Sequence, residues 1–110
     1  MESIDATRAV KALAALAHDR RLSVFRLLVT AGPDGMSPGA IAEQIGLPAP
    51  TLSFHLKELS QAGLIDGHNQ GRHIFYRANY TCMNSLVSFL MENCCAAGRA
   101  CSTTPIDMEA

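Results

Sequence analysis

Three cysteines lie close together near the end of this 110-residue sequence, at Cys94, Cys95 and Cys101. Thiolates bind soft metal ions, and neighbouring thiols also respond to oxidants. Tetrahedral zinc would take a fourth ligand, which is not evident nearby. A thiol enzyme would need a base beside its nucleophile, and this segment has no histidine, so the sequence does not indicate an enzyme. The spacing leaves three interpretations, namely a site for a soft ion, a redox switch, or no role.

The fourth cysteine, Cys82, stands alone before the last apolar repeat and is interpreted as structural. The first residues lack a basic segment followed by an apolar one, and no apolar run approaches the ~20 residues of a membrane span. We therefore expect a cytoplasmic protein without a membrane partner, in which thiols stay reduced.

Composition and charge describe one small domain. Hydrophobic residues make up 48% of the chain, which excludes a disordered tail, and a partner chain often completes the core of so small a domain. The formal net charge is −1, yet residues 6–91 carry eight basic and five acidic side chains, while both ends are acidic. A mildly positive body is compatible with DNA binding but does not establish it.

Apolar periodicity and capping residues predict the secondary structure. Helices are expected over residues 4–17, from a cap at Asp19 to a turn at residues 32–35, from Ser37 to about Ile45, and from Thr51 to Gly63. Apolar and aromatic residues flank a polar stretch, residues 66–71, and this arrangement predicts a β-hairpin with that stretch as its turn. The predicted fold is mainly α, a winged helix-turn-helix of order α-α-α-α-β-β-α.

The last predicted helix carries an apolar stripe that we expect to form a dimer interface together with the first helix. The stripe has helical spacing and consists of Met83, Leu86, Val87, Leu90 and Met91. Cys94 would fall on the same stripe. Neighbouring residues of a regular helix point about 100° apart, so an ion bound by both Cys94 and Cys95 should distort or end the helix. The domain with its dimerisation helices is assigned to residues 1–101, and residues 102–110 to a flexible tail.

Two short helices joined around Gly46 form a candidate helix-turn-helix, and the second of them should enter the major groove of DNA. Its solvent face should offer hydrogen-bonding groups, a phosphate-binding cation and an apolar contact for a thymine methyl group. These candidate DNA-binding residues are Thr51, Ser53, Phe54, His55 and Lys57. The hairpin tip is expected to add Arg72, beside His68, Asn69 and Gln70. A dimerisation module that binds no DNA remains an alternative, although it would not need this polar face.

The same segments resemble the ArsR-type (arsenic repressor) family. Residues 16–22, Leu-Ala-His-Asp-Arg-Arg-Leu, are similar to the start of its second helix. Residues 50–59, Pro-Thr-Leu-Ser-Phe-His-Leu-Lys-Glu-Leu, followed by Ala-Gly-Leu-Ile, resemble its recognition helix and the start of its wing, and Gly71-Arg72 with Tyr76 resembles the second wing strand. The likeness spans roughly residues 13–90. Pro48 departs from the pattern, because the family often has a capping residue such as Ser there.

The resemblance implies a homodimeric repressor that binds an inverted-repeat operator in double-stranded DNA and leaves it when an effector binds. Two metal sites of the family are missing, since residues 36–44 hold no Cys or His and residues 81–93 hold no Asp or His. The cysteines 94, 95 and 101 resemble an arsenite-binding subgroup. Trivalent arsenic and antimony are soft and three-coordinate, so they match three thiolates as inducers, with no organic cofactor. The alternative is a thiol-redox-sensing repressor of the same fold.

Overall fold

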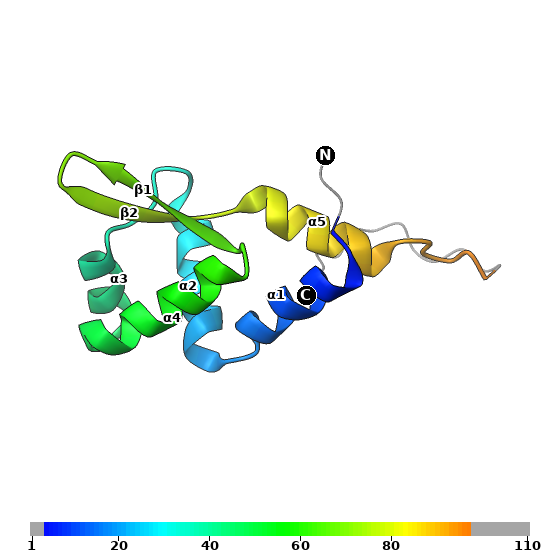
Figure 1. Ribbon diagram of the computed structural model, residues 1–110, viewed down its shortest axis with the longest axis horizontal. Helices are drawn as coiled ribbons and strands as arrows, with labels where there is room; N and C mark the ends of the chain where they lie inside the picture. The colour runs from blue at the N-terminus through cyan, green and yellow to red at the C-terminus, as the bar shows by residue number, and fades with distance from the viewer. Residues whose placement is uncertain (1–3, 98–110) are drawn as a thin grey trace.

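The computed structural model describes residues 4–97 and confirms the predicted order of elements (Figure 1). Within this part of the chain there are five helices and one two-stranded antiparallel sheet. They are α1 (Ala6–Leu16), α2 (Asp19–Ala31), α3 (Pro38–Ile45), α4 (Ala49–Gln61), β1 (Ile65–Gln70), β2 (His73–Ala78) and α5 (Tyr80–Met91). The proposed tail, residues 102–110, lies outside the described residues, as does Cys101.

Most helix ends follow the capping residues of the sequence. The Ser37 hydroxyl accepts a hydrogen bond from the Ala40 amide at 3.2 Å, and Pro38 opens α3 as expected. One predicted cap is wrong, because Asp19 is the first residue of α2 and His18 is the N-cap. The Nδ1 atom of His18 accepts from the Arg20 amide at 3.2 Å, which satisfies a donor that the helix itself cannot.

The turn between α3 and α4 is closed by Gly46 in the left-handed region, with φ of 79°. Its amide donates to the Ala42 carbonyl at 2.8 Å, and the Leu47 amide donates to the same carbonyl at 3.2 Å. Helix α4 begins after Pro48 without a side-chain cap, as the sequence indicated. Two amides of its first turn therefore remain available to an outside acceptor, in the way that helix N-termini commonly meet phosphates.

The hairpin differs from its prediction in the position of the turn. Asp66 to Gln70, predicted as turn residues, form most of β1, and the chain reverses at Gly71 and Arg72 alone. Gly71 has φ of 66°, a value that suits a two-residue hairpin turn. Polar residues can occupy both strands because most of the hairpin is exposed on both faces, so no apolar alternation is required.

The wing is attached to the helix-turn-helix by a backbone bridge that the sequence did not reveal. Met36 and Tyr76 exchange two amide–carbonyl hydrogen bonds of 2.8 Å, so the segment before α3 pairs with β2. Gly35 must come close to β2 here, since a Cβ atom at this position would meet the Tyr76 carbonyl oxygen. The bridge fixes the hairpin relative to α3 and α4.

The core joins all of the helices, but it does not use every apolar position that the periodicity singled out. In α1 the buried residues are Ala9, Ala12 and Ala15, while Val10 and Leu13 are exposed. In α5, Leu86 is only 2% exposed, so it packs inside its own protomer. The assignment of Leu86 to a dimer interface is therefore wrong. The outward apolar residues of α5 are Val87, Leu90 and Met91.

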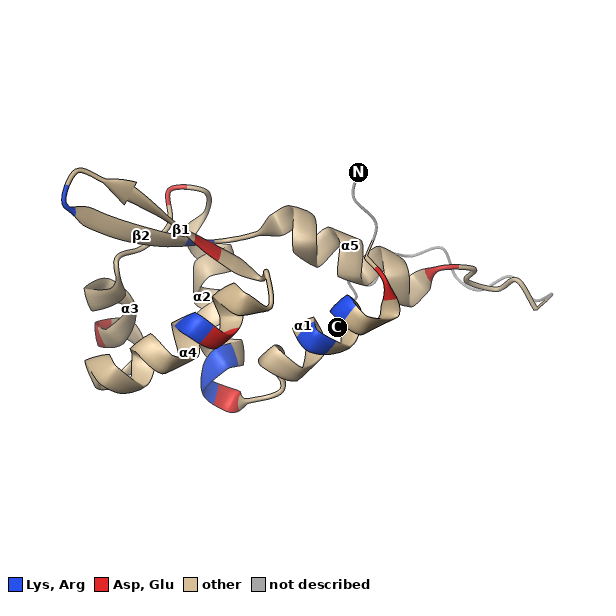
Figure 2. Cartoon of the chain, in the orientation of Figure 1, with Lys and Arg blue, Asp and Glu red and all other residues tan. Residues whose placement is uncertain are grey.

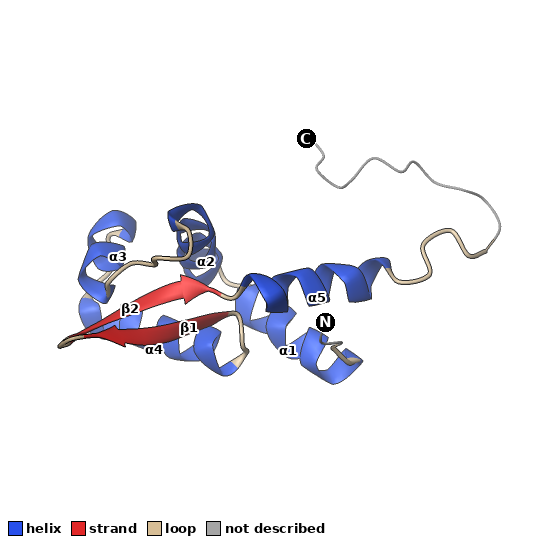
Figure 3. Ribbon diagram, turned by 90° about the horizontal axis from the view of Figure 1, so that it is seen from above, coloured by secondary structure: helices blue, strands red, loops and turns tan. Residues whose placement is uncertain are grey.

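The helix-turn-helix with its hairpin and the exposed apolar residues of α1 and α5 lie at opposite ends of the molecule. The hairpin extends over α3 and α4 at one end, and α1 and α5 lie side by side at the other (Figures 1 and 3). Asn79 links the two ends, since its side-chain oxygen caps α5 at the Cys82 amide and its amide nitrogen donates to the Gly63 carbonyl at 3.1 Å. Within residues 4–97, no helix is long and apolar enough to cross a membrane.

Candidate nucleic-acid interface and cysteine pair

Helix α4 presents most of the predicted DNA-binding side chains on one exposed face. Its buried residues are Leu52, His55, Leu56 and Leu59, which pack toward the core. Thr51, Ser53, Phe54 and Lys57 are exposed, and Phe54 retains 53% of its accessible surface. A large aromatic side chain so exposed beside a lysine and two hydroxyls is suited to contacts with base edges and phosphates.

His55 does not belong to this face, which corrects the prediction that placed it in solvent. Its side chain is 5% exposed, and its Nδ1 atom accepts a hydrogen bond from Nε of Arg21 on α2 at 3.3 Å. The signal was present in the sequence, because residues 52, 55, 56 and 59 have the spacing of a buried helical stripe. A histidine is readily assigned to the surface by its polarity, whereas here Arg21 supplies the partner that burial requires.

Arg21 and His55 belong to a four-residue cluster that joins α2 to α4, which we call the aromatic cluster and define as His18, Arg21, Phe54 and His55. The guanidinium carbon of Arg21 lies 5.6 Å from the centre of the Phe54 ring. The His55 ring lies 4.8 Å from that of His18 and 5.8 Å from that of Phe54, centre to centre. The exposed Phe54 ring is therefore held from behind by a cation and an imidazole.

The surroundings of His55 favour its neutral form. Burial lowers the pKa of His55 below its ordinary value of 6.5, and the neighbouring His18, Arg21 and Arg20 lower that pKa further. The folded chain thus binds this proton less readily than the unfolded chain does. The contribution of His55 to the free energy of unfolding is complete above about pH 6.5 and falls as the pH drops toward the folded pKa.

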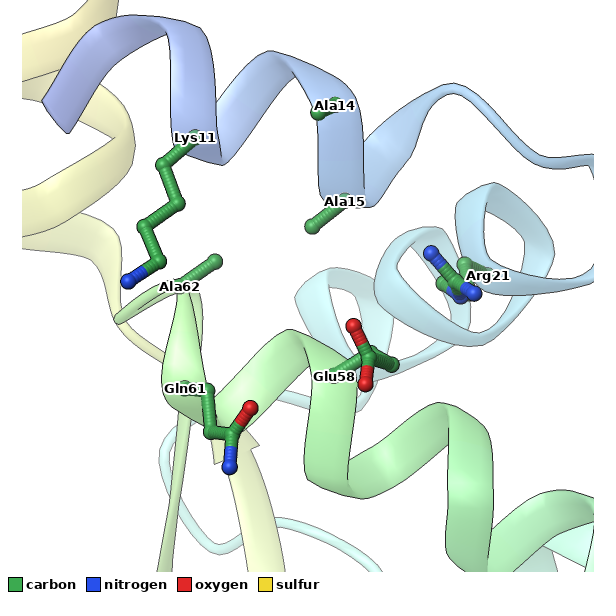
Figure 4. A pocket seen from close by; sticks show the side chains of 7 residues that line it. All are labelled: Lys11, Ala14, Ala15, Arg21, Glu58, Gln61 and Ala62. Carbon is green, nitrogen blue, oxygen red and sulfur yellow. The ribbon is translucent and has the colours of Figure 1, made fainter. Parts of the chain in front are cut away.

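A small open pocket adjoins the aromatic cluster between α1, α2 and α4 (Figure 4). Its volume is about 160 Å³, and its apolar lining is Ala14, Ala15 and Ala62. Lys11, Arg21, Glu58 and Gln61 supply the polar groups, and the Glu58 carboxylate projects into the space beside Arg21. Within residues 4–97, Arg21 and Glu58 do not form an ion pair, so Glu58 is a carboxylate neighbour that the Arg21 guanidinium does not bind.

The wing places a cation beyond the recognition helix. Arg72 lies at the hairpin turn and is exposed, as predicted, whereas His68, Asn69 and Gln70 belong to β1 rather than to the tip. Basic residues also meet where the N-terminal turn of α2 approaches α4, and a single basic residue marks the wing tip (Figure 2). Nε of Arg77 forms an ion pair with the Asp66 carboxylate at 3.0 Å, and because both side chains are exposed the pair contributes little to stability.

The vicinal cysteines lie just beyond α5, not on its stripe. The helix ends at Met91, and Asn93 and Cys95 adopt left-handed backbone angles with φ of 61° and 68°. The sulfur atoms of Cys94 and Cys95 are 3.3 Å apart. The expectation that Cys94 continues the apolar stripe is therefore wrong. The prediction that an ion bound by both sulfurs distorts or ends the helix stays a prediction, and the helix ends three residues before Cys94.

Cys82 lies in a different environment. It is half-buried and packs against the core, and its Sγ lies near Gly63, 3.9 Å from where a Cβ would be. Burial raises the pKa of the Cys82 thiol, although nearby Arg8 acts in the opposite direction. A thiol held protonated in this way is a poor nucleophile and a poor metal ligand, which supports its interpretation as structural. Within residues 4–97, no three side chains of the metal-binding types are gathered into a metal site.

Comparisons with curated proteins identify relatives that regulate transcription. The Helix-turn-helix domain family matches residues 16–68. The chain is 30% identical over 90 residues to the HTH-type transcriptional regulator YgaV of Escherichia coli, covering 82% of this chain and 89% of YgaV. It is 34% identical over 56 residues to the transcriptional repressor SdpR of Bacillus subtilis, covering 51% of this chain and 62% of SdpR. The transcriptional activator HlyU of Vibrio cholerae is 26% identical over 95 residues, covering 86% of this chain and 85% of HlyU.

Solved structures share the fold across most of the chain. An ArsR-like transcriptional regulator from Rhodococcus has a TM-score of 0.72 at 24% identity, covering 83% of this chain and 82% of that one. The homodimeric winged helix-turn-helix DNA-binding domain Mb0332 of Mycobacterium bovis has a TM-score of 0.64 at 24% identity, covering 87% and 89%. A possible transcriptional regulator for arsenical resistance has a TM-score of 0.64 at 25% identity, covering 73% and 80%.

The exposed face of α4, the attached wing and the relatives agree with one another. YgaV matches the chain over almost its whole length, and the structural neighbours reproduce the order of elements around the helix-turn-helix. These relatives are DNA-binding regulators and not enzymes, in line with the sequence interpretation. The chain belongs with YgaV to the HTH-type transcriptional regulators, and its winged helix-turn-helix fold is the one that the ArsR-like regulator from Rhodococcus shares.

Proposed function

We propose that this protein represses transcription as a homodimer bound to an inverted-repeat operator, and that trivalent arsenic or antimony releases it by binding to Cys94, Cys95 and Cys101. The observation that carries the DNA-binding part is the exposed face of α4, with its aromatic, hydroxyl and cationic side chains, beside a wing that ends in Arg72. The N-terminal turn of α4 would enter the major groove, and the wing would reach the adjacent backbone.

The dimer is supported by the outward apolar residues of two neighbouring helices. Val10 and Leu13 of α1 and Val87, Leu90 and Met91 of α5 are between 41% and 64% exposed in one protomer. A second copy would bury them, and Mb0332, which has the same fold, is a homodimer. A two-fold axis through this end would turn the two α4 helices toward successive turns of DNA, which predicts half-sites about one helical turn apart.

Repression follows from the likeness to arsenic repressors and to SdpR, whereas HlyU shows that a relative can activate. The two directions differ in an experiment with a promoter that carries the selected operator. A repressor lowers transcription from that promoter in a purified system, and arsenite restores it. Higher transcription on adding the protein would assign it to activation.

The arsenic part of the proposal is supported by the placement of the cysteine pair. Metal–thiolate bonds are about 2.3 Å long, so one ion can bind two sulfurs at once only if they lie within about 4.6 Å of each other. The Cys94 and Cys95 sulfurs, at 3.3 Å, meet this condition, and the left-handed backbone at Cys95 is the kind of local strain found at functional sites. Cys101, outside the described residues, follows closely enough in sequence to supply a third thiolate.

A thiol-redox sensor is the second candidate, and the same sulfur contact favours it. Two thiols at 3.3 Å need only a modest approach to form a disulfide, which would remove two potential ligands. A mobility-shift experiment distinguishes the candidates. Arsenite or antimonite, but not peroxide, releases the DNA if the ion is the effector. Peroxide alone releases it if the pair is a redox switch, and a protein that never shifts DNA contradicts the whole proposal.

The recognition face makes its own prediction. Ser53→Ala is expected to cost about 1–3 kcal/mol of operator binding and to relax the preference at one base pair, because base contacts carry specificity. Lys57→Ala should weaken binding to all sequences alike and lower the salt slope by about 1, as the loss of one phosphate contact does. Glu43→Ala on the exposed surface of α3 serves as a control. Unchanged affinity in both α4 variants would refute the assignment of this face.

A further inference from the structure

The aromatic cluster suggests how the exposed Phe54 is held in place. The Arg21 guanidinium lies against the Phe54 ring at 5.6 Å, and the same side chain donates from Nε to the buried Nδ1 of His55 at 3.3 Å. His55 is itself fixed by burial and by the His18 ring, which caps α2. Phe54 is thus the exposed end of a chain of contacts that begins on another helix.

We propose that Arg21 and His55 are positioning residues for DNA recognition, which hold Phe54 and the first turns of α4 in the DNA-binding orientation without contacting DNA, and that protonation of His55 releases this hold. The inference rests on the proposed function, because it assumes that the α4 face contacts the operator. To that function it adds two positioning residues that do not themselves contact DNA, and a dependence of DNA binding on pH.

The chemistry of release follows from the hydrogen bond. The Nδ1 atom of neutral His55 accepts the Arg21 proton, so its own proton is on Nε2. A second proton on Nδ1 removes the acceptor and places two cations in contact. Arg21 then has another partner, since the Glu58 carboxylate lines the same pocket (Figure 4). Movement of the guanidinium toward Glu58 would withdraw it from the Phe54 ring.

The groups of α2 and its cap that face His55 oppose its protonation. His18, Arg20 and Arg21 come from α2 and its cap, and together with burial they lower the pKa of His55. On α4 itself the nearby ionisable residue is Glu58, and α1 contributes Lys11, both of which line the adjoining pocket with Arg21. The release is therefore expected below about pH 6.5.

Acidification normally strengthens DNA binding, because histidines gain positive charge. The proposed release opposes this trend. A comparison between the wild type and a variant that differs only at position 55 isolates the effect, since the other histidines are present in both.

His55→Asn is the main variant, because an amide oxygen can accept the Arg21 hydrogen bond and does not titrate. Operator duplex is selected by the wild-type protein from random sequences, and its affinity is measured by fluorescence anisotropy with the full chain. The affinity that each protein has at about pH 7.5 serves as its own reference. At a second, acidic pH, the lowest at which both proteins remain folded, the wild type should have lost roughly 3- to 10-fold more of its affinity than His55→Asn. An identical pH response of the two proteins would overturn the release.

Arg21→Gln tests the positioning role, and Arg20→Gln is its matched control, because each removes one positive charge from the same turn of α2. We expect Arg21→Gln to bind about 3- to 10-fold more weakly at pH near 7.5 with an unchanged salt slope. A slope reduced by about 1 would instead show that Arg21 contacts a phosphate, which overturns the proposal. Equal losses of operator affinity in Arg21→Gln and Arg20→Gln would also overturn the proposal, because the loss would then come from the missing positive charge alone.

Two further observations keep the outcomes separate. Thermal unfolding by circular dichroism at both pH values identifies a variant that fails to fold, and Arg21→Lys, which keeps the charge but lacks the planar guanidinium, should then be measured in its place. Arg21→Lys with wild-type affinity would contradict positioning by the guanidinium. If the wild type binds no DNA at all, the proposed function fails. If it binds DNA and these comparisons fail, only the present inference does.

Discussion

A Leu90→Glu protein is expected to sediment as a monomer and to bind the operator at least about 100-fold more weakly than the wild type. Leu90 is 56% exposed on α5, beside Val87 and Met91, at the end of the molecule where α1 presents Val10 and Leu13. An unpaired carboxylate buried there on dimerisation costs several kcal/mol. A monomer also loses the gain in affinity that comes from engaging two half-sites at once.

The control for this variant is Ser88→Glu, which adds the same charge to the same helix. Ser88 is exposed and lies two residues before Leu90, about 160° around the helix axis from it. It should remain a dimer of normal affinity. Leu86→Glu is not a useful variant, because Leu86 is 2% exposed and a charge there would unfold the protomer itself. A folded, dimeric Leu90→Glu protein with normal affinity would contradict the placement of the interface.

Arsenite is expected to lower the operator affinity of the wild type by roughly 5- to 150-fold, the range of typical allosteric coupling. The ion can do so only if it binds one conformation better than the other. Cys94 and Cys95 follow directly after α5, which carries the outward residues Val87, Leu90 and Met91. An ion that tightens this turn would move the end of that helix and so alter the spacing of the two α4 helices in the proposed dimer.

The Cys94→Ser/Cys95→Ser protein should bind the operator within about 2-fold of the wild type and lose its arsenite response. Cys82→Ser is the matched control and should retain the response, since Cys82 packs against the core. Cys101→Ser should respond weakly to arsenite but normally to a methylated trivalent arsenical, which needs only two thiolates. Release of the triple Cys94, Cys95 and Cys101 serine variant by arsenite would place the site elsewhere, and release of the wild type by peroxide alone would favour the redox switch.

The helices and their order could be predicted from the sequence because helix formation depends on local signals. Ser37 with Pro38 marked the start of α3, Gly46 marked its end, and the missing cap after Pro48 was visible in the sequence. The apolar spacing of α5 predicted its existence and part of its length. The exposed residues of α4 that face DNA in the proposal were also identified, although the buried His55 was wrongly placed among them.

Only the tertiary structure decided which side of each helix is buried and which distant groups meet. A helix with apolar residues on two sides can bury either side. In α1 the packing buries Ala12 and leaves Val10 exposed, and in α5 it buries Leu86 and leaves Leu90 exposed. His55 is buried because Arg21, 34 residues away, supplies its partner, and the wing is held by the pairing of Met36 with Tyr76. The contact of the Cys94 and Cys95 sulfurs depends on left-handed backbone angles after Met91. The spacing of residues 52, 55, 56 and 59 does indicate that His55 faces inward. Local periodicity contains none of these contacts, however, because each depends on atoms that another part of the chain brings into place or on a turn that no repeat specifies.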